Sequence, residues 1–203
     1  MTLRMLSTGR DAFAIVRRSG AIAAAIALFA GAAFTTAAAG AAKEDASMRL
    51  TSTAFGQGAA IPESYTCEGK DVSPPLAWSG VPADAKSLAL IVDDPDAPDP
   101  AAPRMTWVHW VLYDIPPAAT GLAEGIAPRE LPEGTREGLN DWRRSGYGGP
   151  CPPIGRHRYF FKLYALDTVL PDLVRPTKAM LEKAMKGHIL EQAELMGSYQ
   201  KRR

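Results

Sequence analysis

Residues that could act as nucleophiles or bind metal ions are few in this sequence of 203 residues. It has two cysteines and three histidines, and its formal net charge is only +1. It contains neither the H-E-x-x-H pattern of zinc hydrolases nor the G-x-S-x-G pattern of serine hydrolases. These absences argue against two large classes of hydrolytic enzyme. No internal repeat is present either, which argues against a repeat architecture.

The sequence also lacks an excess of charge of one sign. Four basic residues and one acidic residue precede Lys43, which leaves 19 basic and 21 acidic residues in the rest of the chain. That part contains no run of basic residues. Because non-specific binding to nucleic acid depends on basic groups that neutralise phosphates, this balance argues against nucleic acid as a partner.

The chain begins with three segments that are typical of a secretory signal peptide. Residues 1–18 are basic, residues 21–34 are uncharged and apolar, and residues 35–42 are small. We expect cleavage near residues 39–42. The alternative is an uncleaved membrane anchor, but an apolar run of 14 residues is shorter than the roughly 20 that span a bilayer.

The sequence therefore predicts a signal peptide over residues 1–42 and one domain over residues 43–203, in the periplasm or outside the cell. About 160 residues are enough for a single domain with one core. Export would bring Cys67 and Cys151 into an oxidising compartment, where a disulfide between them would close a long loop. In the chain-entropy treatment such a bridge stabilises by about 4 to 5 kcal/mol. Two free thiols are the alternative.

Five segments have the composition of β-strands. Residues 87–92 are a continuous apolar run, which is typical of a central strand buried on both faces. Residues 105–115 and 157–167 are rich in aromatic and β-branched side chains, which also favours strands. Weaker patterns predict a first strand within 48–55 and a short strand at 76–78.

The segments between these strands predict loops and one helix. Acids and prolines at 93–98 indicate a loop of fixed shape, and four glycines and three prolines at 145–156 indicate a rigid loop. Residues 118–142 read as a long excursion. A spacing of 3.6 residues predicts a helix over 177–196, with Thr177 as its N-cap. Together these elements favour a mainly β fold, an antiparallel two-sheet sandwich with a late helix.

Side chains that carry chemistry lie at the ends of the predicted strands. Each of two histidines shares a strand face with aromatic residues, because alternate residues of a strand point to the same side. Two acids follow the buried strand. If these strand ends meet, they form one cluster of imidazoles, carboxylates, an indole and a phenol. Its members are His109, His157, Asp94, Asp96, Trp107 and Tyr159.

This cluster has several interpretations. In an anion site, backbone N–H groups at Gly148-Gly149 would cradle an oxyanion, and the histidines and tyrosine would add donors. In a zinc site, two imidazoles and a carboxylate would be the ligands. In a hydrolase, Cys151 would be the candidate nucleophile, although it lies between prolines. In a purely structural arrangement, each histidine would only form hydrogen bonds within the core.

Two stretches resemble the signatures of the phosphatidylethanolamine-binding proteins. The first is Asp94-Pro95-Asp96-Ala97-Pro98 followed by Trp107-x-His109, and the second is Gly149-Pro150 followed by Gly155-x-His157-Arg158-Tyr159. The run Cys151-Pro152-Pro153 is similar to the bacterial branch called Raf-kinase-inhibitor-like. The likeness extends from about residue 48 to residue 199.

This resemblance implies a Greek-key-like antiparallel β-sandwich and a small surface pocket for phosphate, phosphoryl head groups or other small anions. By position, His109 and His157 would donate to the anion, Gly149 would offer its N–H, and acids would hold the imidazoles. The residues implied for the pocket are Asp94, Asp96, Trp107, His109, Gly149, Pro150, His157 and Tyr159.

Members of this family act mainly as binding proteins and as inhibitors, so the resemblance implies no enzymatic activity, cofactor or metal. We expect an exported protein that binds a small anion and meets membranes only through lipid head groups. An inhibitor of an exported protease or other enzyme is the alternative, and a metal-dependent hydrolase is the third. If histidines hold the anion, binding strengthens as the pH falls through about 6.5, the value of a free histidine.

Overall fold

The computed structural model describes residues 47–202, which form two antiparallel β-sheets, one α-helix and two short 3-10 helices. The expected signal peptide over 1–42 lies outside these residues. One sheet has three strands in the order β1-β2-β5, and the other has five in the order β6-β4-β3-β7-β8. The strands are β1 Arg49–Thr51, β2 Leu76–Ser79, β3 Ser87–Ala97, β4 Met105–Ile115, β5 Gly121–Leu122, β6 Arg136–Glu137, β7 His157–Leu166 and β8 Ile189–Tyr199.

The apolar run at 87–92 forms the centre of the larger sheet. Strand β3 pairs with β4 on one side and with β7 on the other, both antiparallel. Its residues from Ser87 to Val92 are all buried. Both faces are therefore covered, which confirms the prediction of a central strand.

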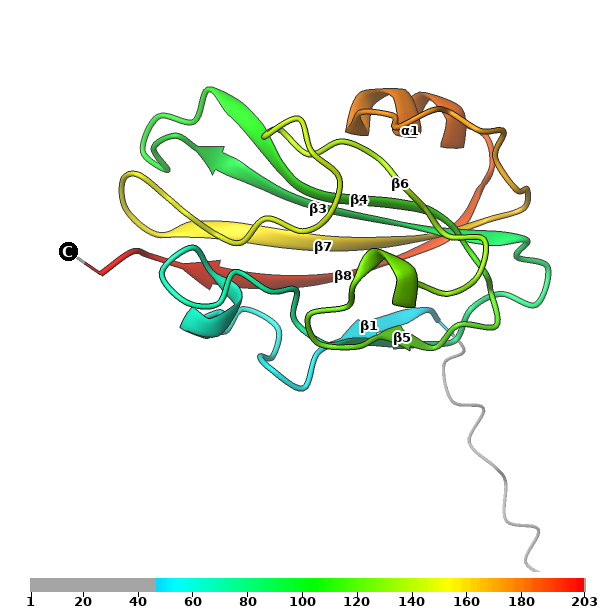
Figure 1. Ribbon diagram of the computed structural model, residues 1–203, viewed down its shortest axis with the longest axis horizontal. Helices are drawn as coiled ribbons and strands as arrows, with labels where there is room; N and C mark the ends of the chain where they lie inside the picture. Colours follow the sequence, from blue (N-terminus) through cyan, green and yellow to red (C-terminus); the bar gives the residue numbers. More distant parts are fainter. Residues whose placement is uncertain (1–46, 203) are drawn as a thin grey trace, which may run out of the picture. The chain divides into compact units, whose positions relative to one another are not determined.

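Two apolar layers account for this burial. Leu88, Leu90 and Val92 point into the main core between the two sheets, while Ala89 and Ile91 point into a second core on the opposite face. Helix α1, Lys178–Met185, covers that second face through Leu181 and Met185. Figure 1 shows α1 on one side of the larger sheet and the small sheet on the other. The predicted mainly β sandwich is confirmed.

The predicted helix over 177–196 is wrong for its second half. Thr177 does cap α1, since its side chain accepts a hydrogen bond from the backbone N–H of Met180. The helix ends at Met185, Gly187 adopts a φ of +85°, and β8 then pairs with β7 along its length. In β8, alternate side chains from Ala193 to Tyr199 enter the main core. The residues of β8 alternate in burial, but its apolar positions also fit the 3.6-residue period of a helix, which explains the wrong prediction.

The predicted loop at 93–98 is also corrected. Strand β3 continues through Asp93 and Asp94 to Ala97, and irregularities in its pairing with β4 follow Val92 and Asp94. The first strand is shorter than predicted, three residues from Arg49 to Thr51. The excursion at 118–142 carries only short elements: β5, β6 and the 3-10 helix Pro128–Glu130. The other 3-10 helix is Glu63–Tyr65.

Helix α1 has only eight residues, and within residues 47–202 no helix combines the length and the apolar character that a membrane crossing requires. At one end of the larger sheet lie the β3–β4 loop, the loop before β7 and the end of β8 (Figure 1). The two signature stretches meet at this end.

Candidate functional site

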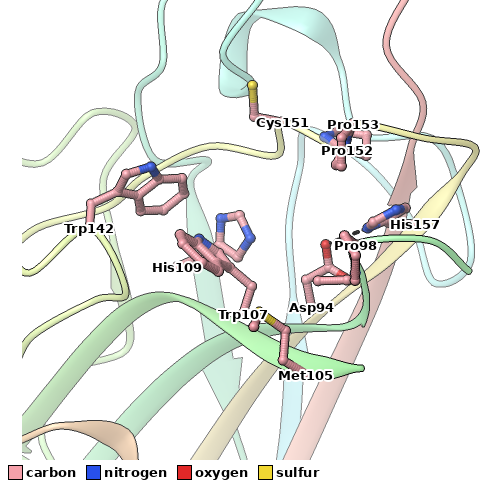
Figure 2. A pocket seen from close by; sticks show the side chains of 11 residues that line it. Asp94, Pro98, Met105, Trp107, His109, Trp142, Cys151, Pro152, Pro153 and His157 are labelled. Carbon is pink, nitrogen blue, oxygen red and sulfur yellow. Dashed lines mark hydrogen bonds and ion pairs between the residues drawn. The ribbon is translucent and has the colours of Figure 1, made fainter. Parts of the chain in front are cut away.

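A cavity of about 330 Å³ opens where the two signature stretches meet. Strands β3, β4 and β7 supply its polar side chains, and the loops around them supply most of the apolar wall. Figure 2 shows the His109 ring among the lining side chains, with Trp142 on one side and Asp94 and Pro98 on the other. The lining residues are Asp94, Ala97, Pro98, Met105, Trp107, His109, Trp142, Cys151, Pro152, Pro153 and His157.

One polar element of the cavity is a buried pair between β3 and β7. Nδ1 of His157 lies 2.7 Å from Oδ2 of Asp94, and the side chains are 0% and 5% exposed. Nε2 of His157 donates to the carbonyl oxygen of Ile154 over 2.9 Å. Both ring nitrogens of His157 therefore face protein oxygens, and neither is free to pair with a ligand. Asp94 thus orients the His157 imidazole.

His109 on β4 has a different environment. Its Nδ1 lies 2.6 Å from the carbonyl oxygen of Gly148, which can only accept, so Nδ1 carries the hydrogen. Nε2 is buried and has no hydrogen-bond partner among the described residues. Burial lowers the pKa of His109, although the Gly148 carbonyl and nearby carboxylates oppose this effect. In the neutral ring, Nε2 therefore presents a lone pair.

Tyr159 on β7 brings the two histidines together. The ring centroids of His109 and Tyr159 are 5.2 Å apart, and those of His157 and Tyr159 are 6.4 Å apart. Burial raises the pKa of Tyr159, and the neighbouring charge of Asp94 adds to this effect. The tyrosine is almost completely buried and is not among the residues that line the cavity. Its ring packs between the two imidazoles.

Asp96 does not contact an imidazole. Its carboxylate accepts hydrogen bonds from Nε and Nη2 of Arg158, at 2.9 and 2.7 Å, and from the Arg158 backbone N–H. These hydrogen bonds hold the pKa of Asp96 below its ordinary value, against the effect of burial. Asp96 therefore ties the end of β3 to the start of β7, one residue beyond the His157 pair.

The glycine cradle expected at Gly148-Gly149 is not available to a ligand in this structure. The N–H of Gly148 donates to the His109 carbonyl over 3.0 Å, and the N–H of Gly149 donates to Oδ1 of Asp71 over 2.7 Å. Both glycines are needed for close packing. A Cβ on Gly149 would lie 2.6 Å from the Tyr65 carbonyl oxygen, and one on Gly148 would lie 2.5 Å from the Trp142 ring.

The aromatic wall contains a residue that the sequence reasoning missed. Trp142 lies edge-on to both Trp107 and His109, with ring centroids 5.4 and 5.2 Å apart. A tight turn presents it, because the side-chain oxygen of buried Asn140 accepts from the N–H groups of Trp142 and Arg144. Trp142 belongs to no strand and to no recognised motif. Its being a tryptophan is the only sequence signal that could have pointed to a role in the site.

The opposite wall consists of the chain around Cys151. The structure joins Cys67 and Cys151 by a disulfide, with their Cα atoms 5.5 Å apart. The N–H of Cys67 also donates to the carbonyl of Pro150 over 3.1 Å. These links fix Pro152 and Pro153 over the cavity. A bridged Cys151 offers no thiolate, which removes the nucleophile considered for a hydrolase.

Of the eight residues implied for the pocket, four line it: Asp94, Trp107, His109 and His157. Asp96, Gly149, Pro150 and Tyr159 support these from behind. Three of the four ring nitrogens of His109 and His157 already face protein acceptors. Within residues 47–202, no three His, Cys, Asp or Glu side chains are grouped to hold a metal ion.

Sequence comparison agrees with this fold. Residues 51–200 match the family described as phosphatidylethanolamine-binding protein, and the chain belongs to this family. The UPF0098 protein of Methanothermobacter thermautotrophicus is 51% identical over 155 residues, which cover 76% of this chain and 99% of the relative. Such relatives place the chain in the bacterial and archaeal branch of the family.

Two solved structures are similar over the same region. The crystal structure of CT736 from Chlamydia trachomatis, a homologue of phosphatidylethanolamine-binding protein, has 47% identity and a TM-score of 0.71. It covers 77% of this chain and 99% of its own. YbcL of E. coli, a member of the same family, has 34% identity and a TM-score of 0.69, and covers 76% and 99%.

Proposed function

We propose that this protein is an exported binding protein whose cavity takes a small oxyacid, such as phosphate or a phosphoryl head group. The observation that carries the proposal is the buried, unpartnered Nε2 of His109, a residue that lines the cavity. A buried polar atom without a partner is costly, and a ligand that pairs with it removes that cost. Family membership supports a binding role.

The dimensions of the cavity fit a small ligand. Its volume of about 330 Å³ is at the lower end of the range for small-molecule sites, about 300 to 1,000 Å³. Trp107 and Trp142 close one side, and prolines close another. A phosphoryl group with a short substituent matches this space better than a whole lipid.

Calorimetric titration tests this proposal. We expect phosphorylethanolamine and inorganic phosphate to bind with one site per chain, and ethanolamine alone to give no saturable heat. Trp142→Ala removes a wall without touching His109 Nε2 and should weaken binding. If ethanolamine binds as well as phosphorylethanolamine, or if neither acid binds at any pH from 5.5 to 8, the proposal fails.

Export is part of the same proposal. It is supported by the basic, apolar and small-residue segments of 1–42 and by the disulfide, a bond that persists in oxidising compartments. N-terminal sequencing of the protein from the periplasmic fraction is the test. A new N-terminus near residues 39–42 supports export, whereas cytoplasmic protein that starts at Met1 contradicts it.

Inhibition of another exported protein is a second candidate, favoured by the apolar rim of the cavity. Met105 and Trp142 line the cavity, and Ile154 follows the lining residue Pro153. These large apolar side chains are 53%, 40% and 55% exposed, respectively. Exposed apolar groups around a pocket are typical of interaction sites. Affinity capture from a periplasmic extract, with Ile154→Ser as a control, would identify a stoichiometric protein partner. Capture that is unchanged by Ile154→Ser contradicts a role for this rim.

A further inference from the structure

The polar groups inside the cavity are acceptors or neutral donors. Both N–H groups of His157 are used by Asp94 and Ile154, and three of the lining residues are prolines, which have no backbone N–H. Neutral His109 offers a lone pair at Nε2. The remaining side-chain N–H donors of the lining are the uncharged indoles of Trp107 and Trp142. A fully ionised phosphoryl group would find no free positive charge here.

The charged groups around His109 are already matched by other partners. Asp94 is paired with His157, and the Asp93 carboxylate accepts from the ammonium groups of Lys162 and Lys178, each at 2.8 Å. Asp141 accepts from the backbone N–H of Val108 over 2.8 Å.

The remaining neighbours of His109 are aromatic. The Tyr159 hydroxyl is neutral, because burial raises its pKa. The guanidinium of Arg144 lies over the Trp142 ring, 5.8 Å from the ring centroid. None of these groups supplies a proton to His109 Nε2 in the free protein.

We propose that the ligand binds together with one additional proton, shared between a ligand oxygen and Nε2 of His109. This inference rests on the oxyacid function proposed above and states which ionisation form the site holds. A phosphate monoester dianion and one proton from solvent enter, and no covalent bond forms or breaks. The ligand is held as an acid O–H donating to Nε2, or as an oxyanion accepting from an imidazolium.

The free protein is prepared for this uptake by the fixed tautomer of His109. Because Nδ1–H is committed to Gly148, the incoming proton can only be placed at Nε2. Burial lowers the pKa of this ring, so it is neutral in the free protein at pH 7.5. A phosphate monoester has its second pKa at about 6, so its dianion also dominates at that pH. Affinity should therefore fall about tenfold per pH unit above neutrality.

The proton count can be measured by calorimetry on the purified protein at pH 7.5 with phosphorylethanolamine. The titration is repeated in two buffers that differ in ionisation enthalpy, and the difference in heat gives the protons exchanged. We expect an uptake close to one proton per ligand. Binding with an uptake near zero, or with proton release, overturns this inference but leaves the binding function standing. Absence of binding in both buffers overturns both.

Two variants assign the proton to one histidine. His109→Gln places an amide, which does not take up a proton, near the position of Nε2. Any remaining binding should therefore proceed without proton uptake. His188→Gln is the matched control, since His188 pairs with Asp167 at the surface and lies outside the cavity. It should keep an uptake near one. Uptake that persists in His109→Gln, or disappears in His188→Gln, contradicts the assignment. If His109→Gln does not fold, the count on the unmodified protein decides.

Discussion

His157 is joined to Asp94 across 2.7 Å, and this bond connects the start of β7 to the end of β3 under the cavity. A second His–Asp pair, His188 and Asp167, has nearly the same distance of 2.8 Å, but its side chains are 46% and 47% exposed. The two pairs therefore differ mainly in burial. They provide a direct comparison of what the same bond contributes in the two environments.

Asp94→Asn should lower the free energy of unfolding by about 3 kcal/mol, because removing one member of a buried hydrogen-bonded pair leaves the other uncompensated. Asp167→Asn should change it by about 0.5 kcal/mol or less, since exposed pairs contribute little. Urea denaturation followed by circular dichroism measures both. Equal effects of the two substitutions would mean that the buried pair is not a structural tie.

The disulfide should be the largest single stabilising element of the loop over the cavity. Cys67 and Cys151 are 84 residues apart in sequence, and a closed loop of this length corresponds to about 4 to 5 kcal/mol. The double variant Cys67→Ser, Cys151→Ser should lose about this amount and bind its ligand more weakly. Thermal unfolding with and without a reductant gives the same comparison in the natural chain. Two thiols that can be alkylated in the native protein would contradict it.

Gly149→Ala should destabilise the protein by about 1 to 3 kcal/mol, the usual cost of overpacking. The added Cβ would lie 2.6 Å from the Tyr65 carbonyl oxygen and 2.8 Å from Thr66 Cα, both backbone atoms that cannot rotate away. Gly56→Ala is a suitable control, because nothing lies within 4 Å of its Cβ. Chemical denaturation distinguishes them. A tolerated Gly149→Ala would show that this loop can move.

Asp96 should make stability depend on pH in the acid range. Hydrogen bonds from Arg158 lower its pKa in the folded protein, so its contribution is present above the unfolded value of about 3.9 and is lost as the pH falls through the folded value. The difference in stability between the natural protein and Asp96→Asn should therefore shrink below about pH 4. Urea unfolding at a series of pH values tests this, and a constant difference across the range would refute it.

Much of the fold follows from local patterns. The apolar run before Asp93 identified the central strand, and aromatic and β-branched residues identified β4 and β7. The end of the chain was harder, because the apolar positions of β8 fit a helical period as well as an alternating one. The pairing with β7 decides between these two structures, and that pairing is not local in sequence.

The sequence indicated where the candidate site lies, but not which hydrogen-bond donors and acceptors it offers to a ligand. In the structure, His109 of the first signature and His157 of the second line one cavity. What each ring can donate depends mainly on distant partners: Gly148 is 39 residues from His109, and Asp94 is 63 residues from His157. The role of Gly149 likewise depends on Asp71 and Tyr65.

The most direct test is nitrogen NMR of the imidazole rings, with ¹⁵N-labelled protein at pH 7.5 and increasing phosphorylethanolamine. We expect free His109 to be neutral with its hydrogen on Nδ1, and the Nε2 signal to move toward a hydrogen-bonded or protonated nitrogen as ligand saturates the site. The signals of His188 should stay in place. An Nε2 signal of His109 that does not move at saturation would contradict the account.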